Sequence, residues 1–358
     1  MAGVYISYPF CAQKCTYCNF ASGVFPRDLE PVYLDTVRAE IRTTEWQWSP
    51  KTVYLGGGTP SFIDPKDLGL MIAEIPGQWE EATIEAAPGS ITPEKAAAWR
   101  HAGINRVSLG VQSFNPHELA RTGRKHTADV VEREITLLRS AGIDNFNVDL
   151  IAGLPGQTLE SWNQSLDWVL RLDAPHVSVY MLEVDEDSRL GAEVIAFGKR
   201  YGAPEIPSDD QIADSYELAV ERLSRAGIAR YEISNFARRG LESQHNLKYW
   251  RREPYLGFGA DAHSFDGEWR WQNPDVIQDY LSHARRERTP ADPVAERFFL
   301  GLRLSEGLEG GWSPFESSIE RFIEDELLEI DGHRLRLTSR GVLLSNEVFA
   351  EFVGTPAL

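Results

Sequence analysis

Residues 11–18 read Cys11-Ala12-Gln13-Lys14-Cys15-Thr16-Tyr17-Cys18, and they contain the only three cysteines of the 358-residue chain. Ordinary buried cysteines would be scattered among hydrophobic positions, whereas three thiolates on one short loop can hold three corners of an iron–sulfur cube. Such clusters usually take four cysteine ligands. A loop with three therefore leaves one iron free for an exchangeable ligand.

Two other interpretations of this cysteine loop fit less well. A disulfide would leave one thiol over, and the chain shows no secretory context. A zinc site would need a fourth ligand and usually a second Cys/His pair. The spacing Cys-x-x-x-Cys-x-x-Cys, with an aromatic residue directly before Cys18, instead favours S-adenosylmethionine (SAM) as the ligand of the open iron.

Composition predicts a soluble globular protein with one large and one smaller domain. Hydrophobic residues make up 42% of the chain and charged residues 25%. The formal net charge is -18, which argues against a nucleic-acid backbone as the main partner. The N-terminal MAGVYISYPF lacks the pattern of a signal peptide, and no apolar run reaches the length of a membrane span. We therefore expect a cytoplasmic protein, with peripheral membrane contact left open.

The N-terminal two-thirds of the chain alternate short β-rich runs with helical stretches. Strands are expected at residues 4–7, 52–55, 82–86, 106–111, 147–151 and 177–182. Strands that alternate with helices form parallel sheets. Six such units predict an α/β fold, an open or partial barrel with its chemistry at the carboxyl ends of the strands.

The remainder of the chain has a different pattern. We expect a strand at 230–236 and an irregular, aromatic-rich stretch at 240–273. Helices are expected at 295–304, 315–326 and 341–352, with a short strand at 335–338. This pattern predicts a small α+β domain at the C-terminus, and its acidic stretch 319–331 argues against contact with nucleic acid.

The second predicted strand ends in a glycine-rich turn, Gly56-Gly57-Gly58-Thr59-Pro60. Glycines lack a Cβ, so their backbone can approach a ligand closely and offer it amide and carbonyl groups. Such a stretch is also common in ordinary turns. The residues alone leave both interpretations open.

Glu85 and two tyrosines are further candidates for ligand contact. Glu85 ends the third predicted strand, where a carboxylate can accept from a ribose hydroxyl or an amino group, or can simply be solvated. Tyr5 lies six residues before Cys11 and is either a ligand contact or a core aromatic. Tyr17 precedes Cys18 and can shield a cluster from water.

Gln112, Arg124 and Asp149 also fall at or near predicted strand ends. The Gln112 amide can both donate and accept a hydrogen bond at the mouth of the barrel. Arg124 can bind a carboxylate of a ligand. Alternatively, Arg124 and Asp149 form a structural ion pair.

A last motif is His245-Asn246-Leu247-Lys248-Tyr249-Trp250. Imidazole is a common axial ligand of heme iron, and aromatic side chains pack well on a flat macrocycle. A histidine beside tyrosine and tryptophan is, however, more often structural. His263 is a weaker second candidate.

The cysteine loop resembles the signature of the radical SAM superfamily, and the other motifs narrow the resemblance to one branch. This branch contains oxygen-independent coproporphyrinogen III oxidase and heme chaperones of the HemW type. The resemblance implies a partial (β/α)6 radical SAM barrel with a small winged-helix-like C-terminal domain. It also implies a [4Fe-4S] cluster on Cys11, Cys15 and Cys18, with SAM on the open iron.

The resemblance implies a role for each remaining candidate. In this family the glycine-rich turn holds the methionine amino group of SAM, and the aromatic before the last cysteine packs beside the adenine. The implied SAM-binding residues are Tyr5, Tyr17, Gly57, Gly58, Thr59, Glu85, Gln112, Arg124 and Asp149. The last three line a second SAM site in the oxidase. The motif His-Asn-x-x-Tyr-Trp marks heme binding in the chaperones and implies that His245 binds heme.

Three features favour the chaperone over the oxidase. Phe20 stands where the oxidase has a further cysteine, the cluster loop begins as early as Cys11, and the His-Asn-x-x-Tyr-Trp motif is present. The resemblance then implies heme as cargo, an acceptor protein and a small reductant protein, and no coproporphyrinogen III dehydrogenase activity. The alternatives are that oxidase activity itself, or a radical SAM enzyme acting on heme.

The predicted organisation has three parts. Residues 1–235 form the radical SAM core barrel, 236–290 form a connecting region with the heme motif, and 291–358 form the C-terminal domain.

Overall fold

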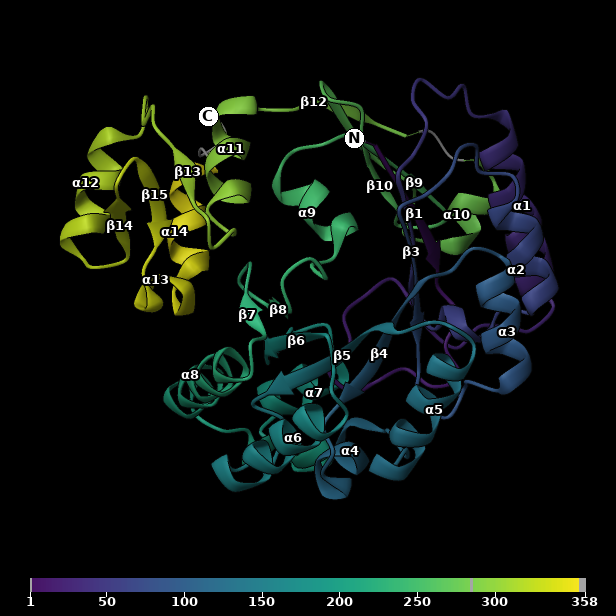
Figure 1. Ribbon diagram of the computed structural model, residues 1–358, viewed down its shortest axis with the longest axis horizontal. Coiled ribbons are helices and arrows are strands. Elements are labelled where there is room, and N and C mark those ends of the chain that lie inside the picture. Colours follow the sequence, from purple (N-terminus) through teal and green to yellow (C-terminus); the bar gives the residue numbers. More distant parts are fainter. Residues whose placement is uncertain (1, 284–285, 354–358) are drawn as a thin grey trace.

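The computed structural model describes residues 2–283 and 286–353. At its centre six strands pair in parallel, in the order in which they occur along the chain (Figure 1). They are β1 (Gly3–Tyr8), β2 (Thr52–Gly57), β3 (Glu81–Ala86), β4 (Arg106–Gln112), β5 (Asn145–Ala152) and β6 (His176–Met181). The predicted α/β fold with six parallel strands is confirmed.

Helices connect these strands and cover the outer face of the sheet (Figure 1). The main ones are α1 (Leu29–Thr43), α2 (Pro65–Ile72), α3 (Pro93–His101), α4 (Pro116–Thr122), α5 (Ala128–Ser140), α6 (Leu159–Arg171), α7 (Arg189–Ile195) and α8 (Asp209–Arg225). Their starts are encoded locally. In α6, for example, the Thr158 side chain accepts from the backbone N–H of Ser161, whose hydroxyl reaches back in a capping box.

The strands place apolar and polar side chains on opposite faces of the sheet. In β2, Val53 and Leu55 are fully buried in the core between the sheet and the helices. Their neighbours Thr52 and Tyr54 face the inside of the barrel. Because side chains alternate along a strand, the same division recurs in the other strands. Polar inner-face residues are Tyr5, Glu85, Ser108, Asn147, Asp149, His176 and Ser178.

The expected strand 230–236 is two short strands, β7 (Ala229–Arg230) and β8 (Asn235–Ala237), which pair in a hairpin. The turn between them is fixed by Glu232, whose carboxylate accepts from the backbone N–H of Ser234, at 3.1 Å, and from the Asn235 amide. β8 then pairs antiparallel with β6 and closes that side of the parallel sheet.

The stretch 240–273 is not irregular, as the sequence suggested, but ordered. It contains α9 (Gln244–Trp250), β9 (Tyr255–Phe258), β10 (His263–Phe265) and β11 (Trp269–Gln272). β9 pairs in parallel with β1, and β10, β11 and β12 (Arg288–Pro290) follow as antiparallel neighbours. This stretch therefore extends the main sheet beyond β1.

The C-terminal domain is a three-stranded antiparallel sheet with helices. Its strands are β13 (Leu308–Glu309), β14 (Leu328–Asp331) and β15 (Arg334–Leu337). Its helices are α11 (Pro293–Gly301), α12 (Glu316–Glu324), α13 (Ser339–Leu343) and α14 (Ser345–Phe352). The expected helix 341–352 is thus two helices, because the backbone at Leu344 leaves the helical region.

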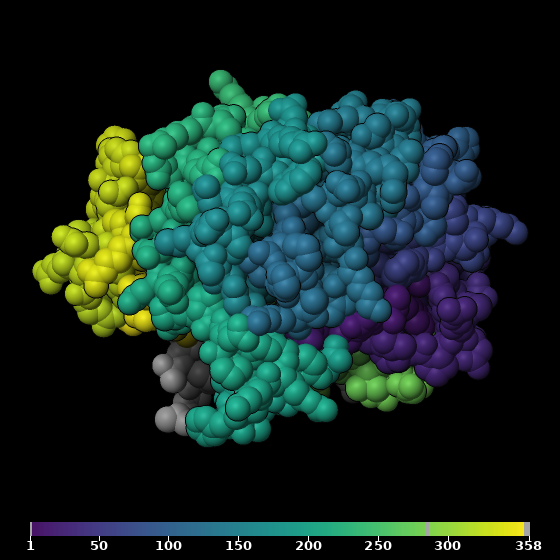
Figure 2. All heavy atoms as spheres, turned by 90° about the horizontal axis from the view of Figure 1, so that it is seen from below, coloured from purple at the N-terminus to yellow at the C-terminus, as the bar shows by residue number. Residues whose placement is uncertain are grey.

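The C-terminal domain lies at one end of the molecule, and the N-terminal segments lie toward the other (Figure 2). Figure 1 shows α9 between this domain and the strands β1 and β9. Among the described residues, no helix combines the length and the apolar character that crossing a membrane requires.

Candidate functional site

The cysteine loop follows β1 and lies over the carboxyl ends of the parallel strands. Its start is held by the Cys11 backbone N–H, which donates to the Gly23 carbonyl at 2.8 Å. Its middle is held by Thr16, whose carbonyl accepts from the backbone N–H of Leu190 at 2.8 Å. The loop is therefore anchored to its own return segment and to α7.

The three cysteines are free thiols, each partly exposed. Burial raises the pKa of the Cys11 thiol, although Ser22 and Thr59 hydrogen bond to it, and the other two cysteines are close enough to raise it further. Among residues 2–283 and 286–353, no three His, Cys, Asp or Glu side chains converge on one metal-ion position. An iron–sulfur cube does not require this, because its cysteines bind different irons. The donor set fits such a cluster.

The glycine-rich turn packs directly beneath the cysteine loop. The backbone N–H of Gly58 donates to the Tyr8 carbonyl at 2.7 Å, and that of Thr59 donates to the Phe10 carbonyl at 3.0 Å. Gly57 has a φ of +110°, a conformation that other residues rarely adopt. A Cβ on Gly58 would lie 2.9 Å from the Cys11 Sγ. Only glycine leaves this space open beside the first cysteine.

Glu85 lies at the end of β3, beside this turn. Its carboxylate accepts from the Tyr54 hydroxyl at 2.9 Å and from the backbone N–H of Gly57 at 3.1 Å. Burial, and then the nearby Asp149, raises the pKa of Glu85 to about 7. Tyr5 stacks on Tyr54 with ring centroids 6.1 Å apart. An arriving ammonium group would meet a carboxyl that ionises readily in its presence.

Arg124 connects the cysteine loop to β4 at the mouth of the barrel. Its guanidinium donates to the Gly110 carbonyl at 2.6 Å and hydrogen bonds to Tyr17. Burial acts to lower the pKa of Arg124, but Tyr17, Cys15 and Asp149 together raise it. Among the described residues, its buried Nε atom has no hydrogen-bond partner and is free to donate to a ligand.

Gln112 of β4 and Asp149 of β5 lie near Arg124 at the mouth of the barrel. Gln112 has a φ of +69°, next to an irregularity in the pairing of β4 with β5, and its amide flanks Gly110. Asp149 accepts from Asn147 at 2.7 Å and from Ser108 at 3.2 Å. Burial raises the pKa of Asp149.

The mouth of the barrel therefore brings together the cysteines and the predicted SAM-binding residues. It holds Tyr5, Tyr17, Gly57, Gly58, Thr59, Glu85, Gln112, Arg124 and Asp149. A connected set of glycine backbone, carboxylates and a guanidinium suits an amino acid joined to a nucleoside.

Sequence reasoning missed a buried hydrogen-bond network centred on Glu118. Glu118 is buried in α4 and accepts from Ser113 at 2.6 Å, from Ser161 at 2.5 Å and from Gln157 at 3.1 Å. Gln157 in turn accepts from the backbone N–H of Gly153 at 2.6 Å. The segments that follow β4 and β5 are thereby tied to one carboxylate, which no pattern in the sequence revealed.

His245 lies away from this mouth, at the amino ends of the strands. One ring nitrogen, Nδ1, is 2.8 Å from the Thr52 hydroxyl, and the other, Nε2, is 2.8 Å from the Tyr249 hydroxyl. The ring stacks on Tyr54 at 5.2 Å, and only 1% of the residue is exposed. Burial, with the nearby Lys248, lowers the pKa of His245 to about 3.

This environment does not fit an iron ligand in the arrangement described. Iron needs an unprotonated ring nitrogen with an open approach, and both nitrogens of His245 are already engaged. Tyr54 connects the two regions, because its hydroxyl reaches Glu85 at the mouth while its ring lies on His245. Its place on the inner face follows from strand alternation, which could have identified it.

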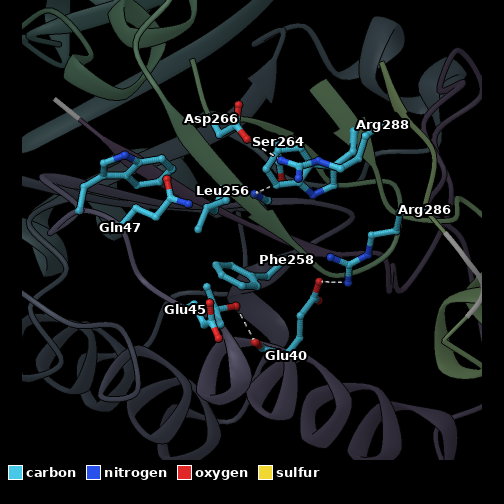
Figure 3. A pocket seen from close by; sticks show the side chains of 13 residues that line it. Glu40, Glu45, Gln47, Leu256, Phe258, Ser264, Asp266, Arg286 and Arg288 are labelled. Atoms are coloured by element: carbon cyan, nitrogen blue, oxygen red, sulfur yellow. Dashed lines mark hydrogen bonds and ion pairs between the residues drawn. The ribbon is translucent and has the colours of Figure 1, made fainter. Parts of the chain in front are cut away.

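A separate cavity of about 180 Å³ lies between α1 and the added strands β9 to β12 (Figure 3). None of the predicted site residues line it. Four of its charged groups form two ion pairs, Glu40 with Arg286 and Asp266 with Arg288 (Figure 3). His263 is exposed on β10 at this edge of the sheet, far in sequence from the cysteine loop.

Comparisons with known proteins cover nearly the whole chain. The sequence model of the Radical SAM superfamily matches residues 5–169, and that of the HemN C-terminal domain matches residues 312–344. The fold is similar to that of coproporphyrinogen III oxidase (HemN) from Escherichia coli, described as a radical SAM enzyme. The TM-score is 0.82 at 22% identity, over 98% of this chain and 89% of that one. This likeness shows the fold.

Sequence relatives are closer. The protein named heme chaperone HemW from Bacillus subtilis is 34% identical over 99% of this chain and all of its own length. The one from Lactococcus lactis is 33% identical over 98% of this chain and 96% of its own, and the one from Escherichia coli is 36% identical over 89% and 82%. The chain belongs to the heme chaperone HemW family of radical SAM proteins.

Proposed function

We propose that the protein is a heme chaperone, which binds heme and transfers it to an acceptor protein while carrying a SAM-ligated [4Fe-4S] cluster. The observation that carries this proposal is the similarity to proteins named heme chaperone HemW along nearly the whole chain. Phe20 supports it, because a further cysteine is expected there in the oxidase. A small reductant protein would supply the cluster with electrons.

The mouth of the barrel is the proposed site of the cluster and SAM. Cys11, Cys15 and Cys18 would hold the cluster, and the glycine-rich turn with Glu85 would hold the amino group of SAM. Bound there, the cluster can supply one electron for cleavage of a carbon–sulfur bond of SAM. The residues of the chain position SAM and exclude water. We place Gln112, Arg124 and Asp149 in the same SAM-binding site because Arg124 contacts Tyr17.

Heme binding is proposed for the second part of the chain, 236–290, through His245. In this division residues 1–235 hold the cluster and SAM, and 291–358 form the C-terminal domain. The binding of heme by His245 requires a rearrangement, because both of its ring nitrogens are engaged.

Anaerobic reconstitution tests this function. The protein is loaded with iron and sulfide and then offered heme or coproporphyrinogen III in parallel, each with SAM and a reductant. Stoichiometric heme binding that depends on His245, without porphyrin product, supports the chaperone. Conversion of coproporphyrinogen III to protoporphyrinogen IX would instead identify the oxidase.

Two sets of variants separate the roles. Cys11→Ala, Cys15→Ala or Cys18→Ala should lose the cluster and keep heme binding, as read from iron and sulfide content. His245→Ala should lose heme and keep the cluster. His101→Ala, at an exposed position on α3, is the matched control and should change neither. Equal heme affinity in His245→Ala would refute the heme site.

A further inference from the structure

Helix α9, which carries His245, is held against the barrel by two buried side chains from the starts of neighbouring strands. The Glu81 carboxylate accepts from the backbone N–H groups of Gln244, at 3.0 Å, and His245, at 2.9 Å. Thr52 is 2.8 Å from the His245 ring. The first N–H groups of a helix have no partner within the helix. Glu81 supplies partners for two of these N–H groups, and Thr52 holds the His245 side chain; we call Thr52 and Glu81 the seat of α9.

While α9 contacts its seat, access to the ring of His245 is blocked by Tyr249 and Tyr54. Tyr249, one turn further along α9, occupies the second ring nitrogen of His245, and Tyr54 covers one face of the ring. Thr52 and Glu81 are 1% and 4% exposed, so the whole contact is shielded from water. A macrocycle cannot approach His245 while the helix stays in this position.

We propose that α9 is a latch: heme binds to His245 only after the helix leaves its seat, and Thr52 and Glu81 are positioning residues that hold the site closed. This inference rests on the proposed function, since it concerns the same histidine. The apparent affinity for heme then equals the intrinsic affinity multiplied by the open fraction. Weakening the seat should therefore tighten heme binding.

Movement of α9 away from its seat would also change its contacts with the C-terminal domain. The next residue of the motif, Trp250, stacks under the guanidinium of Arg303 at 4.3 Å, and that arginine lies just beyond α11. Tyr249 packs edge-on against Tyr255 of β9 at 4.6 Å. The helix therefore contacts three parts of the fold, and its departure should be visible in all three.

The test compares heme titrations of the cluster-loaded wild type with those of Thr52→Val and Glu81→Gln. Thr52→Val removes one hydrogen bond of the closed state, and Glu81→Gln removes the charge that attracts the helix N-terminus. We expect heme to bind about fivefold to tenfold more tightly to each, as read from the heme absorbance. Thr83→Val is the matched control, because this buried β3 hydroxyl has no hydrogen-bond partner among the described residues.

Hydrogen exchange of the amides of residues 244–250 provides the second measurement. Both seat variants should exchange faster there without heme, and wild-type protein should lose protection at these amides when saturated with heme. If heme-saturated wild type keeps full protection, or if the seat variants exchange faster yet bind heme with unchanged affinity, the latch is refuted. If the wild type binds no heme at all, the proposed function fails instead.

Discussion

Replacing Glu85 with glutamine should make the stability of the protein less dependent on pH. Burial and the neighbouring Asp149 raise the pKa of Glu85 from 4.5 to about 7 in the folded protein. Between these values the folded state keeps a proton that the unfolded chain has released. The folded state binds more protons than the unfolded chain in this range. The contribution of Glu85 to the free energy of unfolding is therefore fully present below pH 4.5 and is lost as the pH rises through 7.

The size of this effect follows from the two pKa values. Their difference corresponds to about 3 kcal/mol of unfolding free energy lost across the window. Glutamine does not titrate and can keep both contacts, since its oxygen can accept from the Gly57 N–H while its amide donates to Tyr54. Glu85→Gln should therefore equal the wild type near pH 4.5 and exceed it by up to about 3 kcal/mol at pH 8.

Calorimetric melting of cluster-free, SAM-free protein from pH 5.5 to 8 measures this difference. The melting temperature of Glu85→Gln should rise above that of the wild type by roughly 5 °C at the upper end. Glu217→Gln, at an exposed position of α8, removes the same charge elsewhere and serves as the control. Parallel pH profiles for the wild type and Glu85→Gln would refute the reasoning.

Three further substitutions test other parts of the structure. Gly58→Ala places a Cβ 2.9 Å from the Cys11 Sγ, so reconstituted protein should lose most of its iron and sulfide; a normal iron content would contradict this. Glu118→Ala leaves three buried donors without their acceptor and should destabilise the protein by about 3 kcal/mol or more, an expectation that an unchanged denaturant midpoint would exclude. Arg303→Met removes one of two cations, Arg303 and Arg230, that act on the buried Glu232 carboxylate, which should cost about 2 kcal/mol and expose the C-terminal domain to limited proteolysis; equal resistance of variant and wild type would show that this charge interaction does not hold the domain.

The parts of the fold that could be predicted are those whose signal is local. Each βα unit carries its own alternation and its own helix period, so the six parallel strands could be located from short windows. The cysteines are close in sequence, and the strand ends placed Glu85 and Gln112 near them. The mouth of the barrel follows from these local signals and one topological rule.

The parts that could not be predicted depend on contacts between distant segments. β9 has only four residues, too few for alternation to distinguish a strand, and it is ordered by pairing with β1 some 250 positions earlier. The motif around His245 predicts heme binding, but it does not predict which residues surround the histidine. Its burial depends on Thr52, which lies 193 residues away, and on Glu81.

The alternation of the strands also determines how the inside of this barrel interacts with water. A cavity lined with leucine and phenylalanine stays dry and weakens its protein through the contacts that are missing, whereas one lined with hydroxyls, amides and carboxylates fills with water. The small cavity of about 20 Å³ that Tyr54 lines together with Ser108, Asn147 and Ser178 is of the second kind. The polar inner face and the hydrophobic core lie on opposite faces of the same strands, so a change inside the barrel leaves the packing of the core intact.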